Sequence, residues 1–163
     1  MQIYMKKSDF IVSKTDLKGR ITYGNETFIK MSGYTEQELL NTPHNILRHK
    51  DMPAVVFQFL WQRLKEKSFI NAYVKNRCKN GDYYWVFANV TASYSHTEEE
   101  SPIGYYSVRR APKKSAIEVI ENLYKTLLEC EKKSGLQASK ELLQKILNDK
   151  GVSYDELIIS LQK

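Results

Sequence analysis

Three consecutive basic residues, Arg48, His49 and Lys50, stand a few positions before a predicted helix that begins near Pro53. An arginine offers paired hydrogen-bond donors, and the start of a helix adds partial positive charge. Together they predict a site for a phosphate or pyrophosphate, with nearby aromatic side chains available to wall a flat ring. The alternative is that these residues make surface ion pairs, as most charge clusters do.

Other chemistry is not expected from this sequence. On a helix, the spacing of His44 and His49 corresponds to about 500° of rotation, so the two rings would not share a face for a metal ion. The chain has no Gly-x-Ser-x-Gly motif and no glycine-rich phosphate loop. Cys78 and Cys130 form no Cys-x-x-Cys pair, which favours reduced thiols. We therefore expect a binding protein that holds no metal, and not an enzyme.

The formal net charge of +6 invites a nucleic-acid hypothesis. However, the basic residues are spread along the chain and alternate with Glu and Asp, so no nucleic-acid partner is expected. No apolar run approaches the ~20 residues that span a bilayer, which argues against direct membrane insertion. Residues 1–10 lack the apolar segment of a signal peptide. A cytoplasmic protein is the expectation.

Residues 9–111 hold nearly all the aromatic residues and show strand patterns. Two strands, a block of short helices and a three-stranded meander are expected. The strands are residues 10–15, 20–23, 69–78, 83–94 and 102–110, and the helices are 26–31, 36–40 and 53–67, with a polar loop at 95–101. This order predicts an α+β fold with a five-stranded antiparallel sheet, short helices on one face, and any cavity between the two.

Residues 112–163 differ in character, with Leu, Ile, Lys and Glu at helical spacing. Pro112 ends the last strand, and Ser115 with Glu118 has the spacing of a capping box. The pattern predicts a C-terminal extension of three short amphipathic helices. Their apolar stripes must be buried, either on the chain's own domain or against another protein. Ordering a residue costs ~1–2 kcal/mol in backbone entropy, so an extension that only covered its own domain would be costly. We therefore expect the extension to form a dimer or receptor-docking surface.

A resemblance to a known family rests on four segments: residues 32–40, 43–53, 74–89 and 104–109. The pattern Pro-His-Asn-x-x-Arg-His-x-Asp-Met-Pro in the second segment is quite specific. Residues 8–111 resemble the PAS domain of aerotaxis receptors, so a PAS sensor domain is expected over residues 1–111. Because no transmembrane segment or signalling coiled coil follows, the chain is most similar to stand-alone PAS sensors of bipartite energy-taxis systems.

The resemblance implies a redox or energy sensor that binds FAD non-covalently. The family's functional positions correspond to Asn25, His44, Arg48, His49, Asp51 and Asn76. Arg48 and His49 would neutralise the pyrophosphate, Asp51 would orient Arg48 or a ribose hydroxyl, and Asn76 would meet the polar edge of the flavin ring. Asn89, on the next strand, is either a similar contact or a solvent-facing residue.

Several aromatic and cysteine positions refine this expectation. The family often has a Trp where this chain has Ile70, which leaves an apolar wall without ring stacking. Trp61 and Trp85 are expected in the core. The segment 44–51 contains no Cys, so a light-driven flavin adduct is not expected.

The expected partner is a membrane chemoreceptor that lacks its own PAS domain, which would place this cytoplasmic chain at the inner membrane. Association of two copies through the C-terminal helices is a further expectation. Two alternatives remain on the same fold. One is a haem-binding gas sensor with His44 or His49 as the axial ligand. The other is a PAS adaptor or dimerisation module without a cofactor.

Overall fold

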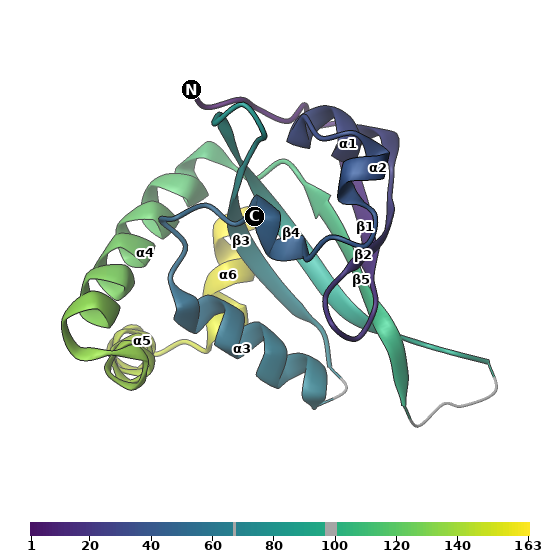
Figure 1. Cartoon of the computed structure of the whole chain (residues 1–163). Coiled ribbons are helices and arrows are strands. Elements are labelled where there is room, and N and C mark those ends of the chain that lie inside the picture. Colours follow the sequence, from purple (N-terminus) through teal and green to yellow (C-terminus); the bar gives the residue numbers. More distant parts are fainter. Residues whose placement is uncertain (67, 97–100) are drawn as a thin grey trace.

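A central antiparallel sheet organises the molecule (Figure 1). The computed structural model describes residues 1–66, 68–96 and 101–163. The strands lie in the order β2-β1-β5-β4-β3, and every pairing is antiparallel. They are β1 (Phe10–Thr15), β2 (Ile21–Gly24), β3 (Ile70–Arg77), β4 (Tyr83–Tyr94) and β5 (Pro102–Arg110). The predicted α+β PAS fold with a five-stranded sheet is confirmed. Residue 67 of the predicted helix and residues 97–100 of the predicted loop lie outside the described residues.

Short helices cover one face of the sheet. They are α1 (Glu26–Ser32), α2 (Glu36–Leu39), the 3₁₀ helix η1 (His44–Leu47) and α3 (Ala54–Lys65). Local capping explains where the first two begin. The Asn25 side chain accepts a hydrogen bond from the Phe28 amide, and Thr35 with Glu38 forms a capping box. The segment between α2 and α3 contains η1, which turns His44 toward Ser13 of the sheet.

The two faces of the sheet serve different purposes, because side chains alternate along a strand. Val74 and Asn76 of β3 point toward the short helices. Tyr73 and Lys75 point to the opposite face, where the C-terminal helices lie. This alternation separates a cavity-facing side of the sheet from a structural side, which the C-terminal helices cover.

Three C-terminal helices follow, as predicted: α4 (Lys114–Ser134), α5 (Leu136–Lys150) and α6 (Tyr154–Gln162). Ser153 and Glu156 form a capping box at the start of α6. The box predicted for Ser115 and Glu118 is absent, since α4 begins two residues earlier than a Ser115 cap would allow, after Lys113 and without a side-chain cap. Among the described helices, none combines the length and apolar composition needed to cross a bilayer.

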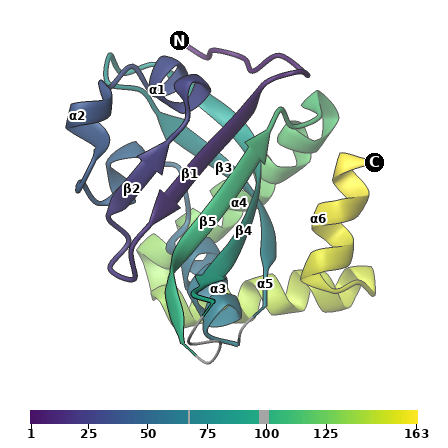
Figure 2. The same cartoon turned by 90° about the vertical axis from the view of Figure 1, so that its right-hand side faces the viewer.

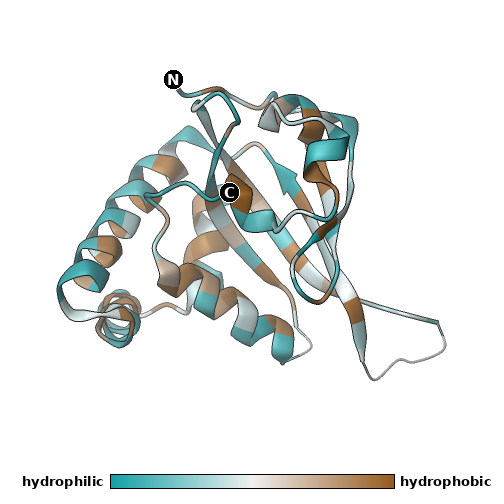
Figure 3. Ribbon diagram, viewed as in Figure 1, coloured by the Kyte–Doolittle hydropathy of each residue, from teal (hydrophilic) through white to brown (hydrophobic). Residues whose placement is uncertain are grey.

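The apolar stripes of these helices are buried within the chain itself. α4 and α6 cover the structural side of the sheet, and α5 reaches α3 beyond the β3 edge (Figures 1 and 2). The Tyr124 hydroxyl donates to the Tyr73 carbonyl at 2.7 Å, and Ile120, Leu127 and Ile158 are almost fully buried. Apolar and polar segments alternate along α4 in Figure 3, as expected for an amphipathic helix. These stripes are therefore not the exposed docking surface that the entropy argument favoured, because the chain's own sheet covers them.

Candidate functional site

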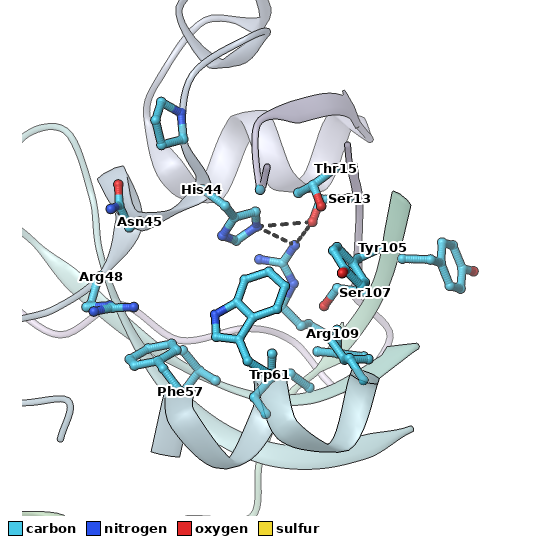
Figure 4. A pocket seen from close by; sticks show the side chains of 18 of the residues that line it. Ser13, Thr15, His44, Asn45, Arg48, Phe57, Trp61, Tyr105, Ser107 and Arg109 are labelled. Atoms are coloured by element: carbon cyan, nitrogen blue, oxygen red, sulfur yellow. Dashed lines mark hydrogen bonds between the residues drawn. The ribbon is translucent and has the colours of Figure 1, made fainter. Parts of the chain in front are cut away.

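A cavity of about 260 Å³ lies between the sheet and the short helices (Figure 4). Residues from η1, α3 and four strands line it, so segments far apart in the sequence meet there. Three of the predicted site residues belong to this lining: His44, Arg48 and Asn76. The lining also includes Ser13, Lys18, Phe57, Trp61, Val74, Val90 and Arg109.

A polar cluster of Ser13, His44 and Arg109 occupies the inner end of the cavity (Figure 4). The Arg109 Nη2 atom donates a hydrogen bond to Ser13 Oγ and lies 3.4 Å from His44 Nε2. Ser13 Oγ lies 3.2 Å from the same nitrogen. The His44 ring stacks on Phe28 at a centroid distance of 5.9 Å, which fixes its plane. The cluster joins β1, η1 and β5.

Electrostatics decides the protonation of this cluster. Burial, followed by the nearby charge of Arg109, lowers the pKa of His44 to about 3, so its ring is neutral at pH 7. Burial also lowers the pKa of Arg109, to about 10, which still leaves it charged. Since a guanidinium only donates, His44 Nε2 is the acceptor. A lone pair engaged in this way disfavours His44 as an axial haem ligand through Nε2.

Aromatic and aliphatic side chains form the walls of the cavity. Trp61 and Phe57 project from α3, opposite Val74 and Val90 of the sheet. Trp61 was expected in the core, but its side chain lies at the cavity and is 38% exposed, in edge contact with Tyr105. Trp85 is a core residue as expected, buried beside Tyr124 on the structural side.

Arg48 lies on another part of the cavity, away from the polar cluster (Figure 4). Its guanidinium carbon is 3.7 Å from the centre of the Phe57 ring, a cation–π contact. Burial lowers the pKa of Arg48 but leaves it a cation. Arg48 and Lys18, which both line the cavity, add positive charge to its otherwise apolar walls.

Two donor groups in this cavity are buried without a hydrogen-bond acceptor in the described part of the chain. They are Nδ2 of Asn76 and the Nε and Nη1 atoms of Arg109. A buried donor without an acceptor loses its hydration with no compensation. A ligand that brought acceptor atoms to this wall would restore these hydrogen bonds.

Asn25 and Asn89 do not lie at the cavity. The Asn25 side-chain oxygen accepts from the amides of Val12 and Phe28, and its nitrogen donates to the Phe10 carbonyl. This asparagine joins β1 to α1, and its hydrogen bonds are spent on the backbone. Asn89 donates to the Asn71 side chain at 3.0 Å on the structural side of the sheet, one position from the cavity-lining Ala88.

His49 and Asp51 also lie beside the cavity and not in it. The Asp51 carboxylate pairs with Lys75 Nζ at 2.8 Å, and not with Arg48. Burial works to raise the pKa of Asp51, but the hydrogen bond and charge of Lys75 outweigh it and lower the pKa. The His49 ring lies against Tyr83 at 5.5 Å, and its Nδ1 accepts from the Asp51 amide. These two residues hold the loop that presents Arg48.

Arg109 and Ser13 are the site residues that the sequence interpretation missed. Both occur in strands that were predicted correctly, and Arg109 ends one of the segments that carried the family resemblance. The alternation of β5 could have placed Arg109 on the same face as Ser107 and Tyr105. Ile70, where the family often has Trp, is fully buried in the core and is not among the described lining residues.

The cysteines and acidic residues form no second centre within residues 1–66, 68–96 and 101–163. No group of three or more His, Cys, Asp or Glu residues there could hold a metal ion. Burial, assisted by Asp82, raises the pKa of the Cys78 thiol to about 11. Such a thiol is inert at neutral pH.

The sheet order, the helices on one face and the cavity between them define a known class of protein. The PAS fold family matches residues 21–108, more than half of the chain, and the chain belongs to this family. Its PAS domain is of the aerotaxis-receptor type. It is 44% identical over 117 residues to the aerotaxis receptor of Escherichia coli (strain K12), a match that covers 72% of this chain and 22% of the receptor. The chain thus spans about a fifth of the length of the curated relatives that it matches.

Solved structures share the same architecture. A PAS domain from Colwellia psychrerythraea has a TM-score of 0.58 and 18% identity, covering 64% of this chain and 87% of that chain. A light-oxygen-voltage domain studied with a flavin analogue has a TM-score of 0.59 and 16% identity, covering 72% of this chain and 86% of that chain. At these identities the likeness shows the fold alone.

Proposed function

We propose that this chain is a flavin-binding PAS sensor that follows redox or energy state and signals to a separate membrane chemoreceptor in energy taxis. One observation carries the proposal. The cavity has apolar and aromatic sides, whereas its inner wall presents donors of Arg109 and Asn76 that lack acceptors in the described chain. A flavin ring has the matching character, an apolar plane with one acceptor-rich edge. The 44% identity to the aerotaxis receptor supports the same role.

The size of the cavity fits part of a flavin nucleotide. At about 260 Å³ it is close to the lower end of ligand sites, which measure roughly 300–1,000 Å³. It suits a flat ring, and the remainder of the ligand would extend past Arg48 and Lys18. Two cations in these positions favour the pyrophosphate of FAD over the single phosphate of FMN. The resemblance to aerotaxis receptors also favours FAD.

In this proposal a bound flavin supplies reversible redox chemistry, and the residues of the chain bind it and detect its state. Arg109 and Asn76 orient the polar edge, and Phe57 with Trp61 excludes water from the ring. Arg48 holds the phosphates. His44 and Ser13 position the Arg109 side chain. No nucleophile or acid–base pair is assigned, so the proposal is a sensor and not an enzyme.

Ion pairs connect the loop that presents Arg48 to the C-terminal helices. Asp51 lies three residues beyond Arg48, and Lys75 Nζ contacts both Asp51 at 2.8 Å and Glu121 of α4 at 3.3 Å. Lys75 is 5% exposed, but the side chains of Asp51 and Glu121 are 49% and 56% exposed, so salt still screens these pairs in part. We propose that movement of Arg48 on a change of ligand state shifts α4 through this network.

The proposed shift of α4 leads to a proposed partner and location for the chain. A membrane chemoreceptor without its own PAS domain would read the outer surfaces of α4 to α6, because their inner stripes are occupied. A cytoplasmic chain would then be recruited to the inner membrane by the receptor. Association of two copies through the outer surfaces of these helices is a further arrangement with the same logic.

The test is the absorption spectrum of the purified protein, followed by chromatography of the ligand released by heat. We expect the two flavin bands in the blue and near-ultraviolet, and FAD in the supernatant. A Soret band would establish the haem alternative instead. A protein expressed with adequate flavin that carries no chromophore, and takes up none on titration, would overturn the proposal in favour of a cofactor-free adaptor.

A further inference from the structure

Arg109 is a buried cation without a counter-ion. Its side chain is 2% exposed, and no carboxylate within the described residues forms an ion pair with it. Only Nη2 is engaged, with Ser13 and His44, whereas Nε and Nη1 have no partner in the same set of residues. Burying a charge in this way is costly unless something compensates it. The described residues supply neither a counter-ion for Arg109 nor acceptors for its Nε and Nη1 atoms.

The neighbours of Arg109 do not supply this compensation. His44 is neutral and already accepts from Arg109, and Ser13 Oγ is shared with His44. The Arg109 guanidinium also lies 5.0 Å from the Phe28 ring centre, a cation–π contact that leaves the N–H groups without acceptors. Asn76 Nδ2 and the buried Tyr84 hydroxyl are further polar groups of the sheet without a hydrogen-bond partner in the described residues. Tyr84 lies near enough to Arg109 for the two to influence each other's pKa, but as a neutral phenol it brings no negative charge. The inner wall therefore has a surplus of donors and a net positive charge.

We propose that Arg109 is the residue that binds the acceptor edge of the ligand, and that its charge favours the ligand form that is negative at that edge. The proposal rests on the flavin-binding function above and deepens it. An external electron donor, such as dithionite in vitro, would supply two electrons, and the solvent one proton, to convert a bound oxidised flavin into a reduced flavin that is negatively charged at its pyrimidine edge. Uptake of a second proton would neutralise that edge. A fixed guanidinium beside it stabilises the charged form and raises the reduction potential.

Arg48 does not serve this purpose. It stacks on Phe57 and lies apart from the Ser13–His44–Arg109 cluster in Figure 4. In this proposal the two arginines bind different parts of one ligand. Arg48 binds the phosphates, and Arg109 binds the redox-active edge. The same assignment makes Arg109 a determinant of the potential at which the sensor responds.

The experiment compares wild type with Arg109→Gln, Arg109→Lys and the exposed control Arg77→Gln. Far-ultraviolet CD first establishes that each variant folds, and flavin titration establishes binding. The midpoint potential of bound flavin is then measured with reference dyes. In Arg109→Gln, we expect the affinity for reduced flavin to fall roughly tenfold more than that for oxidised flavin. For a two-electron couple this lowers the potential by about 30 mV. Arg109→Lys and Arg77→Gln should stay near wild type.

A second measurement needs no variant and covers the case in which Arg109→Gln does not fold. In mildly acidic solution the potential of the wild type should change by about 30 mV per pH unit, which is one proton per two electrons. A slope for two protons would overturn the proposal, as would a folded, flavin-loaded Arg109→Gln protein with an unchanged potential. A wild-type chain that binds no flavin overturns the flavin function together with this assignment. In contrast, flavin binding without these effects overturns the assignment alone.

Discussion

Glu131, near the end of α4, places its carboxylate 2.8 Å from the backbone amide of Val55 in the first turn of α3. The other carboxylate oxygen accepts from the Ala54 amide at 2.9 Å. Pro53, at the cap position, provides no side-chain hydrogen bond, so a distant glutamate caps the helix. Ser139 of α5 donates to the same carboxylate at 3.2 Å. The helix that carries Phe57 and Trp61 into the cavity is thus fixed at its start by the C-terminal helices.

The Glu131 cap predicts a specific loss of stability. Glu131→Gln removes the negative charge and at least one of two hydrogen bonds at the start of α3. We expect the free energy of unfolding to fall by about 1 kcal/mol in urea denaturation. Glu129→Gln, an exposed position on the same helix, is the matched control and should leave stability unchanged. Equal midpoints for the two variants would show that the cap contributes nothing.

Because the C-terminal helices share a core with the sheet, a substitution in that core should lower the free energy of unfolding more than loss of the Glu131 cap does. Leu127 is fully buried, so Leu127→Ala should lower the free energy of unfolding by about 2–5 kcal/mol. Leu136, at the start of α5, is 38% exposed and provides the matched control. Its replacement by Ala should cost less than about 1 kcal/mol. A Leu127→Ala protein as stable as the control would contradict the packing of α4 on the sheet.

His44 predicts how stability depends on pH in the ligand-free protein. The unfolded imidazole gains a proton near its ordinary pKa of 6.5, whereas folded His44 stays neutral until about pH 3. The folded state binds fewer protons between these values, so this contribution is complete above pH 6.5 and is lost as the pH falls. The expected loss below that pH is about 1.4 kcal/mol per pH unit.

Urea unfolding at several pH values between about 5 and 7 measures this dependence. His44→Gln should remove most of the slope, because its side chain cannot take up a proton in either state. His96→Gln, at an exposed histidine, should retain the wild-type slope. If His44→Gln and wild type lost stability in parallel, the buried neutral state of His44 would be disproved.

Arg48 predicts a loss of ligand with the fold preserved. Arg48→Ala removes an exposed cation at the cavity and its contact with Phe57. Losing a charged contact that a bound ligand buries typically costs ~2–5 kcal/mol of binding. We expect flavin affinity to fall roughly thirtyfold or more, with a native far-ultraviolet CD spectrum. Arg77→Ala removes an exposed arginine from the end of β3 and should bind flavin as wild type does. Unchanged flavin content in Arg48→Ala would remove Arg48 from the site.

Local physics was readable from the sequence. The strands follow from runs of β-branched and aromatic residues, and the caps at Asn25, Thr35 and Ser153 follow from side chains that satisfy nearby backbone amides. These interactions span a few residues, so the local sequence can indicate them, although the same spacing at Ser115 and Glu118 forms no cap. The segment from Pro43 to Pro53 likewise directed attention to His44 and Arg48, which do reach the cavity.

Long-range placement was decided by the tertiary structure. Arg109 meets His44 across 65 positions of sequence, because β5 lies beside β1 in the sheet and η1 brings His44 against Ser13 of β1. No local pattern encodes that neighbour. Asp51 forms an ion pair with Lys75 of β3 and not with Arg48, and no local pattern encodes this partner either. An amphipathic stripe specifies that a helix face must be buried but not which surface covers it. The tertiary structure shows that the covering surface is the sheet of the same chain, where the Tyr124 hydroxyl of α4 donates a hydrogen bond to the Tyr73 carbonyl of β3.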